Sequence, residues 1–517
     1  MRLNKRFLII FIEIFLSFIK INESAKILAV FPFPGRSQYI LVQPYLKALA
    51  QRGHELTVIN AYPGKENIKN YRDIAVMEIH NVQEFFVNGA QEERNMWNEL
   101  TFLSDFFTNV TLTVMKNPQV QNLLQIESFD LIILESINTD AWYSFGAHFK
   151  APIIGISSYG TDPIIDELLG NISPFTYVPL MSTGFTEQMS YKNRMQNLLQ
   201  KVLELIHNHL VHVPRHQHIV DRYMPHIKEP VSELRRNMSL FLMNQHFSLS
   251  SPRSYVTNMI EVGGIQIQHE PKPLTAEIND FLNNSSQDVI YFSMGSNIKS
   301  KDFPLETLRI FNEVFASLPY KILWKFENPQ LPGKPKNVLI SPWFPQGDIL
   351  AHPKVKLFMS HGGLLSTFET VYHGKPILGL PVFFDQQQNV NKAQQQGFAL
   401  RLDFASFSRE QLKSSILEML NNPQYRQRAK EISVRYHDQP IKPLDLAIYW
   451  TEYVLRHNGA AHLQSPAQKM GYFQKHGLDV LAGLGLMILS VVIFFNWLLL
   501  KILKVIFVTN PIKVKIN

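Results

Sequence analysis

Residues 343–386 contain side chains whose types and spacing suit the binding of a phosphorylated ligand. Gly362 and Gly363 follow an apolar run and precede a helix pattern. Glycines at such a junction let a ligand approach the backbone, and free amides at a helix N-terminus bind anions such as phosphate. His361 could donate a hydrogen bond to the same anion. The junction therefore predicts a phosphate site at the end of a strand.

Other side chains of this stretch would complete a site for a nucleoside carrying a sugar. Trp343 offers a flat face for a base, and Glu369 could accept hydrogen bonds from ribose hydroxyls. Asp385 and Gln386 could hold further sugar hydroxyls. Each of these residues also has an ordinary structural explanation, as a turn, a core aromatic or a solvated charge. Their order within one stretch favours a binding site.

The elements that must position this site alternate between apolar runs and helix patterns. An apolar run at 26–31, a helix pattern over 42–49 and a second run at 56–59 form a βαβ unit, which predicts a parallel sheet. Further strands are expected at 129–134, 151–156, 288–293, 321–324, 338–340, 355–359 and 376–380, with a polar turn between the first two. The pattern predicts two α/β halves, joined near Glu270.

A histidine-rich helical region lies between about 185 and 245. Five histidines fall within twelve positions: His207, His209, His212, His216 and His218. Pro214 stands between His212 and His216, which argues against one shared helical face. Because no carboxylate has a useful spacing, a polar helix or loop is favoured over a metal site.

Composition excludes several classes of function. The length of 517 residues indicates two or three domains, and the net charge is +7. Residues 1–25 hold four basic and two acidic side chains, and residues 501–517 hold four lysines and no acid, so the chain between them carries only +1. A nucleic-acid partner is therefore not expected. The absence of cysteine excludes a disulfide scaffold, a thiol nucleophile and a cysteine metal site.

Both chain ends have the pattern of targeting segments. A basic start, an apolar run at 7–21 and small residues at 24–25 have the layout of a signal peptide over 1–25, while Glu13 and Glu23 leave an uncleaved anchor open. Residues 480–500 carry no charge and are long enough to cross ~30 Å of hydrocarbon as a helix. The lysines that follow place the tail in the cytosol by the positive-inside rule.

This topology places the body in the lumen of the secretory pathway. Four sequences match the glycan acceptor pattern and begin at Asn109, Asn171, Asn237 and Asn283. Lys513 and Lys515 resemble a dilysine signal for return to the endoplasmic reticulum, although a basic flank of the span explains them equally well. We expect a single-pass type I protein of the endoplasmic reticulum membrane; self-association stays open.

The stretch from Trp343 to Gln386 resembles the signature of family 1 UDP-glycosyltransferases, in the membrane-bound animal branch that includes the UDP-glucuronosyltransferases. Supporting sequences are Phe31–Gly35, Arg52–His54 and Phe292–Ser296, and the run after His361 is similar to insect members. The resemblance implies a GT-B architecture of class α/β, with two Rossmann-like domains facing a cleft and one C-terminal transmembrane helix. The implied division is signal 1–25, acceptor domain 26–270, UDP-sugar domain 271–455, juxtamembrane segment 456–479, transmembrane helix 480–500 and tail 501–517.

The resemblance also implies roles for single residues in binding the donor. The residues so implied are Ser293, Gly295, Trp343, Gln346, His361, Gly363, Ser366, Thr367, Glu369, Asp385 and Gln386. Trp343 and Gln346 would contact uracil and ribose, and Glu369 would take the ribose hydroxyls. Ser293, His361 and Gly363 would meet the diphosphate, with Ser366 or Thr367 nearby. Asp385 and Gln386 would hold the sugar.

The expected reaction is a single displacement that inverts the anomeric carbon. No Asp-x-Asp pair occurs in the sequence, so neither a metal nor another cofactor is expected, and the UDP-sugar acts as a co-substrate. The leaving UDP would be stabilised by helix-end amides and His361. The expected product is a β-glycoside of glucose or glucuronic acid on a small lipophilic acceptor, as in detoxification.

The general base is the open point of this interpretation. The family normally carries a histidine after Pro-Gly-x-Ser, where this sequence has Gln38, and glutamine cannot take a proton at neutral pH. Glu135 matches the family's partner acid, and Asp140 is a second candidate. Two alternatives to an active enzyme follow: a pseudoenzyme that binds UDP-sugars, and a membrane-anchored protein that binds small lipophilic molecules.

Overall fold

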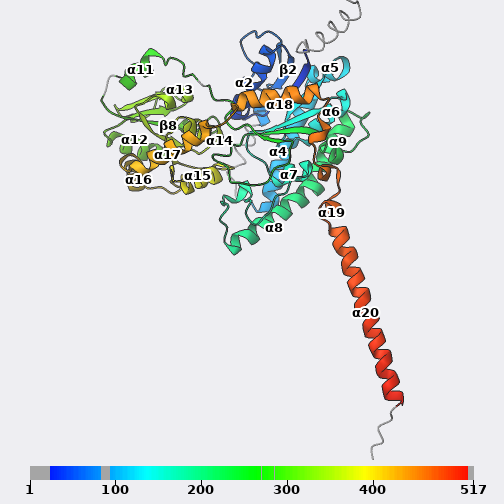
Figure 1. The fold of residues 1–517 in the computed structure, drawn as a ribbon. Coiled ribbons are helices and arrows are strands. Elements are labelled where there is room, and N and C mark those ends of the chain that lie inside the picture. Colours follow the sequence, from blue (N-terminus) through cyan, green and yellow to red (C-terminus); the bar gives the residue numbers. More distant parts are fainter. Residues whose placement is uncertain (1–23, 83–93, 269, 284–285, 510–517) are drawn as a thin grey trace, which may run out of the picture.

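The computed structural model describes residues 24–82, 94–268, 270–283 and 286–509, which form two α/β domains and one long C-terminal helix (Figure 1). Most of the predicted signal segment and the lysines at 513 and 515 lie outside the described residues. The two domains lie side by side, with the first in blue to green and the second in green to orange.

The first domain is built on a seven-stranded sheet in which every neighbouring pair is parallel. Its strand order is β3-β2-β1-β4-β5-β6-β7. The strands are β1 (Lys26–Phe31), β2 (Glu55–Asn60), β3 (Tyr71–Ala75), β4 (Leu131–Glu135), β5 (Ile153–Ser157), β6 (Met238–Met243) and β7 (Met259–Glu261). All residues of β4, β5 and β6 are buried, as expected for parallel strands covered on both faces.

The helical elements of this domain connect and cover the strands. They are α2 (Arg36–Gln51), α4 (Met96–Lys116), α5 (Pro118–Ile126), η1 (Asp140–Tyr143), α6 (Ser144–Phe149), α7 (Pro163–Leu169), η2 (Met181–Thr183), α8 (Tyr191–His207), η3 (Asn208–His212), α9 (Val213–Tyr223) and α10 (Val231–Leu234). Segment 140–149 was expected as a polar turn. The structure has η1 and α6 there, because two neighbouring parallel strands need a crossover between them.

The second domain repeats the architecture with a six-stranded parallel sheet of order β10-β9-β8-β11-β12-β13. Its strands are β8 (Val289–Ser293), β9 (Lys321–Lys325), β10 (Val338–Ser341), β11 (Val355–Ser360), β12 (Ile377–Gly379) and β13 (Ala399–Arg401). Its helical elements are α11 (Ala276–Asn283), η4 (Ser300–Asp302), α12 (Leu305–Ala316), α13 (Gln346–Ala351), α14 (Leu364–Tyr372), α15 (Gln386–Gln395), α16 (Arg409–Asn421) and α17 (Pro423–His437).

After α17 the chain returns to the first domain. From the sequence, the second domain was instead expected to continue to residue 455. Helix α18 (Pro443–Arg456) packs on α2, where Arg52 pairs with Glu452 and the Tyr45 and Thr451 hydroxyls are hydrogen-bonded. The short turns η5 (Ala461–Leu463) and η6 (Pro466–Lys469) continue over the same domain. Gln468 donates to the Met238 carbonyl at 2.9 Å. Long-range packing therefore decides this boundary.

The chain ends in α19 (Tyr472–Lys475) and α20 (Leu478–Thr509). Residues 478–506 of α20 are long and apolar enough to cross a membrane. The most apolar part of this stretch is not buried against the rest of the described structure. The helix continues beyond the predicted span of 480–500. Lys501 and Lys504, predicted to lie in the tail, belong to its last turns.

The histidine cluster is placed differently from the prediction. Pro214 does not break the helix, because it stands in the first turn of α9 and follows the π-helical segment η3, so the missing amide costs little there. The rings of His212 and His216 lie on one face with centroids 4.3 Å apart, and both are buried. His212 bonds to Ser104, and His216 accepts from the Ala141 amide, so both serve the core.

Candidate functional site

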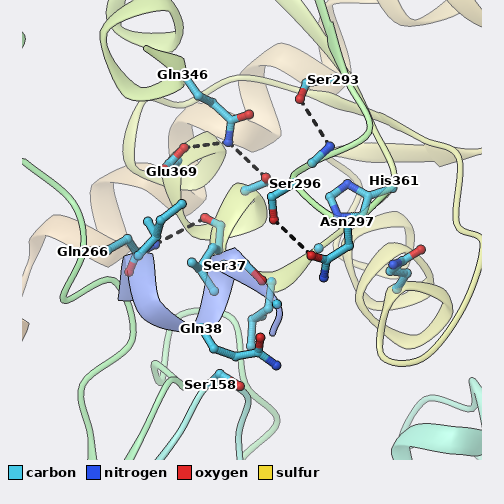
Figure 2. A pocket seen from close by; sticks show the side chains of 18 of the residues that line it. Ser37, Gln38, Ser158, Gln266, Ser293, Ser296, Asn297, Gln346, His361 and Glu369 are labelled. Carbon is cyan, nitrogen blue, oxygen red and sulfur yellow. Dashed lines mark hydrogen bonds between the residues drawn. The ribbon is translucent and has the colours of Figure 1, made fainter. Parts of the chain in front are cut away.

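A cavity of about 660 Å³ lies between the two domains, at the carboxyl ends of both sheets (Figure 2). Its first wall comes from segments that follow β1, β4 and β5. Its second wall comes from the region after β8 and from residues 343–386. This is the position where α/β folds with parallel sheets bind ligands.

Gln346, Ser366 and Glu369 form a bonded cluster on the second wall. The Gln346 amide nitrogen donates to the Glu369 carboxylate at 2.7 Å (Figure 2) and to the Ser366 hydroxyl at 3.0 Å. These residues come from α13 and α14, which the fold brings together. Burial raises the pKa of Glu369 to about 7, and the bond from Gln346 works against that rise. The cluster is a preformed acceptor for hydroxyl groups.

His361 is held between two glycines at the end of β11. A side chain on Gly295 or on Gly363 would come within 2.5 Å of its ring, so both positions require glycine. Gly295 also has φ +79°, which favours glycine. Burial, with a smaller effect from Lys325, lowers the pKa of His361 to about 4. His361 is therefore neutral at pH 7 and has one N–H to donate.

Helix α14 begins beside this histidine. Its N-cap residue Gly363 supplies no side-chain cap, and the amides of its first turn have no acceptor from that side chain. The helix end and the His361 ring both line the cavity. Together they can bind an anionic group, such as a diphosphate.

Trp343 is 46 % exposed and lines the cavity, as expected for a stacking platform. The Arg36 guanidinium of the first domain lies 4.5 Å from its ring centroid, and the Lys325 ammonium lies 5.8 Å from it. Such cation–π contacts are worth ~0.5–1 kcal/mol at exposed sites. The Arg36 contact joins the two walls of the cavity.

Asp385 and Gln386 line the cavity at the start of α15. Asp385 accepts from the Asn389 amide at 2.6 Å, and burial raises its pKa to about 6. The side-chain carbonyl oxygen (Oε1) of Gln386 accepts from the backbone amides of Val382 and Phe383 at 2.9 and 3.1 Å. That oxygen holds the loop, so the NH2 group of Gln386 is the part that could contact a sugar.

Ten of the eleven predicted donor residues line the cavity, and Thr367 does not. The Thr367 hydroxyl is buried and donates to the Gly363 carbonyl at 3.1 Å, within the first turn of α14. Thr367 therefore supports the helix end. Ser293 lines the cavity and accepts from the Gly295 amide at 3.3 Å.

The first wall is mainly apolar. Its large apolar side chains are Phe33, Leu103, Phe106, Phe107, Ile137 and Met181. Gln38, on the first turns of α2, faces the cavity among them, and its buried carbonyl oxygen has no hydrogen-bond partner among the described residues (Figure 2). An acceptor with one hydroxyl group would find apolar walls and the polar side chain of Gln38 here.

Glu135 lies behind this wall, at the end of β4. It is 3 % exposed, and in the described parts of the chain neither carboxylate oxygen has a hydrogen bond of good geometry. Burial raises the pKa of Glu135 to about 8, and the nearby Ser158 hydroxyl works against that rise. Ser158 itself lines the cavity beside Gln38 (Figure 2). Ser158 therefore lies near both the cavity and a buried carboxyl group.

The position of Asp140 argues against a role as the base. It is buried away from the cavity lining and accepts from the Arg235 guanidinium at 2.8 Å. Arg235, with help from His212 and His216, outweighs burial and lowers the pKa of Asp140. An aspartate held this way stays ionised and forms a buried ion pair within the first domain.

Ser158 and Lys325 are among the cavity residues that were not predicted from the sequence, and neither was the contact of Arg36 with Trp343. Ser158 follows β5 directly and could have been found from the rule that ligands bind at carboxyl ends of parallel strands. No local sequence pattern predicts that Arg36 or Lys325 lies beside Trp343. Within the described ranges, no group of three or more His, Asp or Glu side chains is placed to hold a metal ion.

The four predicted glycosylation sites differ in accessibility. Asn109, Asn237 and Asn283 are exposed. Asn171 is 4 % exposed, and its amide donates to Asp166 at 2.8 Å. A glycan needs that amide at the surface, so the burial of Asn171 argues against this site.

Comparisons with known proteins agree with this geometry. Residues 26–511 match the model of the family described as UDP-glucoronosyl and UDP-glucosyl transferase. The chain is 35 % identical to a UDP-glycosyltransferase of Dactylopius coccus (UGT5), over 93 % of each chain. It is 28 % identical to human UDP-glucuronosyltransferase 2B10, over 86 % of this chain and 87 % of the other.

Solved structures show the same fold at low sequence identity. Spinosyn forosaminyltransferase SpnP superposes with a TM-score of 0.57 at 14 % identity, over 84 % of this chain and 100 % of the other. The calicheamicin glycosyltransferase CalG4 gives 0.56 at 14 % identity, over 84 % and 99 %. The expected GT-B architecture of two parallel-sheet domains is thereby confirmed.

Proposed function

This chain belongs to the UDP-glucuronosyl and UDP-glucosyl transferase family, and we propose that it transfers glucose from UDP-glucose to small lipophilic acceptors with inversion, forming β-glucosides. That it is a glycosyltransferase with a UDP-sugar donor follows from the family. The acceptor class, the sugar, the stereochemistry and the base are the proposed parts. The observation that carries the proposal is one cavity with a polar, hydrogen-bonded wall opposite an apolar wall.

The polar wall suits the donor. Trp343 is an exposed ring for uracil, and Glu369 is positioned by Gln346 to accept from ribose hydroxyls. The uncapped start of α14 and the neutral His361 would bind the diphosphate and stabilise the negative charge that develops on UDP as it leaves. These groups are already oriented, so little reorganisation is needed during the reaction.

Glucose is proposed as the sugar on electrostatic grounds. Asp385, expected to hold the sugar, has a pKa of about 6 and is mostly ionised at neutral pH. Its negative charge would repel the carboxylate of glucuronic acid. A relative that is 33 % identical over 92 % of each chain carries the name UDP-glucosyltransferase 2.

The proton of the acceptor hydroxyl is proposed to leave through Ser158. In this scheme Ser158 passes its own proton to the Glu135 carboxylate as it takes the proton of the acceptor. The acceptor oxygen then forms a bond to the anomeric carbon while the bond from that carbon to UDP breaks. Attack from the face opposite UDP inverts the centre. The Gln38 side chain, which also lines the cavity, would contact the acceptor beside Ser158 before transfer.

The proposed location is the endoplasmic reticulum membrane, with α20 as a single anchor. Residues 478–506 have the length and composition of a membrane span. The lysines at 501, 504, 513 and 515, in the last turns of this helix and after it, support a cytosolic tail and a luminal body. Protease added to sealed microsomes should trim only the short tail; digestion of the whole body would contradict this orientation.

The test of the proposed reaction is a transfer assay with the full chain in microsomes. UDP-glucose and UDP-glucuronic acid are supplied separately with phenols of graded size, and the product is analysed by NMR. We expect turnover with UDP-glucose and a β-linkage. An α-linkage would contradict the single displacement. UDP binding without turnover on any acceptor would favour the pseudoenzyme.

A further inference from the structure

Helix α8 buries polar side chains and exposes a row of large apolar ones. The side chains that it buries are Asn197, Gln200 and His207. Its exposed row of large side chains, which continues one turn into η3, consists of Tyr191, Met195, Leu199, Val202, Ile206 and Leu210. We call this row the apolar face of α8. A helix on the water-facing surface of a protein normally has the opposite arrangement.

The buried polar residues are explained by the contacts that they make. The Asn197 side chain accepts from the Leu180 amide at 2.8 Å and donates to the carbonyls of Phe175 and Val178 at 2.9 Å. Gln200 bonds to Ser182. These bonds fix the loop before α8. They do not require the outer positions to be apolar, and Leu199 on that side is 60 % exposed.

The position of α8 indicates what covers this face. Helix α7 packs against α8 and also against η6, shortly before the membrane helix. Lys475 pairs with Glu167 of α7 at 2.9 Å, and α20 begins three residues later. In Figure 1, α8 lies along the edge of the body from which α20 extends. The intervening helix α19 also exposes an aromatic side chain, Phe473, at 69 %.

We propose that the apolar face of α8 docks on the surface of the bilayer that α20 crosses, in contact with phospholipid acyl chains. This inference rests on the proposed membrane anchor. An interfacial helix places its apolar face about 5–10 Å into the boundary between headgroups and acyl chains. The exposed Tyr191 and Lys192 at the start of α8 suit the headgroup level.

Docking would bring the acceptor wall close to the lipid. Met181, in the loop that α8 holds through Ser182, lines the cavity. Lipophilic acceptors are concentrated in the bilayer, so a docked α8 would place the apolar side of the cavity near their source. The second domain, which holds the donor residues, would remain in water.

The test uses the full chain in phosphatidylcholine vesicles and relies on its lack of cysteine. Leu199→Cys gives a single labelling site on the apolar face, and Leu305→Cys gives a matched control on α12 of the second domain, where the leucine is 80 % exposed. Each variant carries a polarity-sensitive fluorophore. Quenching is measured with phospholipids that carry a nitroxide near the headgroup.

We expect at least about a twofold loss of fluorescence for the label at 199, because a shallow nitroxide reaches the depth of an interfacial helix. The label at 305 should lose none. Equal behaviour of the two labels would overturn the proposal. Shielding at 199 that depends on protein concentration, without quenching by lipid, would assign the face to a second copy of the chain and also overturn it.

Two controls separate this proposal from the proposals on which it depends. Flotation of the full chain with the vesicles tests the anchor independently of α8. UDP binding of both labelled variants, measured by calorimetry, tests the donor site and should equal that of the unlabelled chain. Loss of flotation would locate the failure in the anchor, and loss of UDP binding would locate it in the proposed function.

Discussion

The two walls of the cavity are built in opposite ways. The donor wall takes most of its side chains from residues 343–386, one stretch of the chain, and several of them are bonded to one another. The acceptor wall collects apolar side chains from separate segments around 33, 103–107, 137 and 181. A fixed ligand such as UDP suits a contiguous, preformed site. Varied lipophilic acceptors suit a wall whose segments can change independently.

The carboxyl groups of the two walls also differ in their hydrogen bonds. Glu369 and Asp385 on the donor wall each accept a hydrogen bond from an amide side chain at 2.6–2.7 Å. Glu135 behind the acceptor wall is buried without a comparable bond in the described structure, and burial raises its pKa further, to about 8. Bonded carboxylates hold a ligand. A carboxyl group without a hydrogen bond of good geometry, whose pKa lies near the working pH, is suited to moving a proton.

Replacing Glu135 tests this contrast with the largest expected effect. Glu135→Gln keeps the size of the side chain and removes the proton acceptor, so kcat should fall by ~10²–10⁴-fold. UDP affinity should stay unchanged because the donor wall is untouched. In the unmodified enzyme, activity should rise as the pH increases towards about 8, because the ionised form is the base. Rates are measured from pH 6 to pH 9.

The matched control for that experiment is Ser158→Ala, which removes the proposed relay and leaves the carboxyl group. It should lower kcat less than Glu135→Gln does, because water can replace a hydroxyl. An unchanged rate and pH profile in Glu135→Gln would show that the base lies elsewhere.

Trp343 tests the donor wall. Trp343→Ala removes the exposed ring and should weaken UDP binding by ~1–3 kcal/mol, or about 5–150-fold, by analogy with base stacking on aromatic side chains. Trp343→Phe should retain most of the affinity. Calorimetry with UDP measures both variants, with and without a chelator. Equal affinity of the alanine variant and the unmodified chain would contradict the placement of uracil.

Gln38 tests whether the acceptor wall accepts a conventional base. Gln38→His would place an imidazole with a pKa near ~6.5 beside Ser158 and should raise the rate on phenols by at least ~10-fold. Weakly acidic alcohols should gain more, because their transfer depends more on proton removal. A folded variant with unchanged rate and acceptor preference would show that Gln38 does not face the reacting hydroxyl.

Arg36 joins the two walls, and its replacement has the smallest expected effect. Its guanidinium covers one face of Trp343 at 4.5 Å, so uracil must displace it if both use that face. Arg36→Ala should strengthen UDP binding by about 2–5-fold, the equivalent of ~0.5–1 kcal/mol. Arg36→Lys is the control that keeps the charge. Weaker binding in Arg36→Ala would show instead that the positive charge attracts the diphosphate.

Local sequence patterns were sufficient to predict the alternation of strands and helices and most residues of the donor wall. Apolar runs at 26–31 and 355–359 predict buried parallel strands, because such strands are covered on both faces. The pair Gly362-Gly363 followed by a helix pattern predicts an anion site, because amide direction follows from the backbone alone. Family resemblance added the roles of single residues. These features depend on neighbours in the sequence.

Only the tertiary structure decided the features that depend on distant partners. Asp140 and Glu135 are only five positions apart, yet Asp140 pairs with Arg235, whereas Glu135 has no ion pair among the described residues. Burial without a partner raises the pKa of one acid, and an ion pair lowers the pKa of the other. The return of α18 to the first domain and the outward apolar face of α8 have the same origin. A sequence specifies side-chain chemistry, whereas the protonation and exposure of a side chain depend on what the fold places beside it.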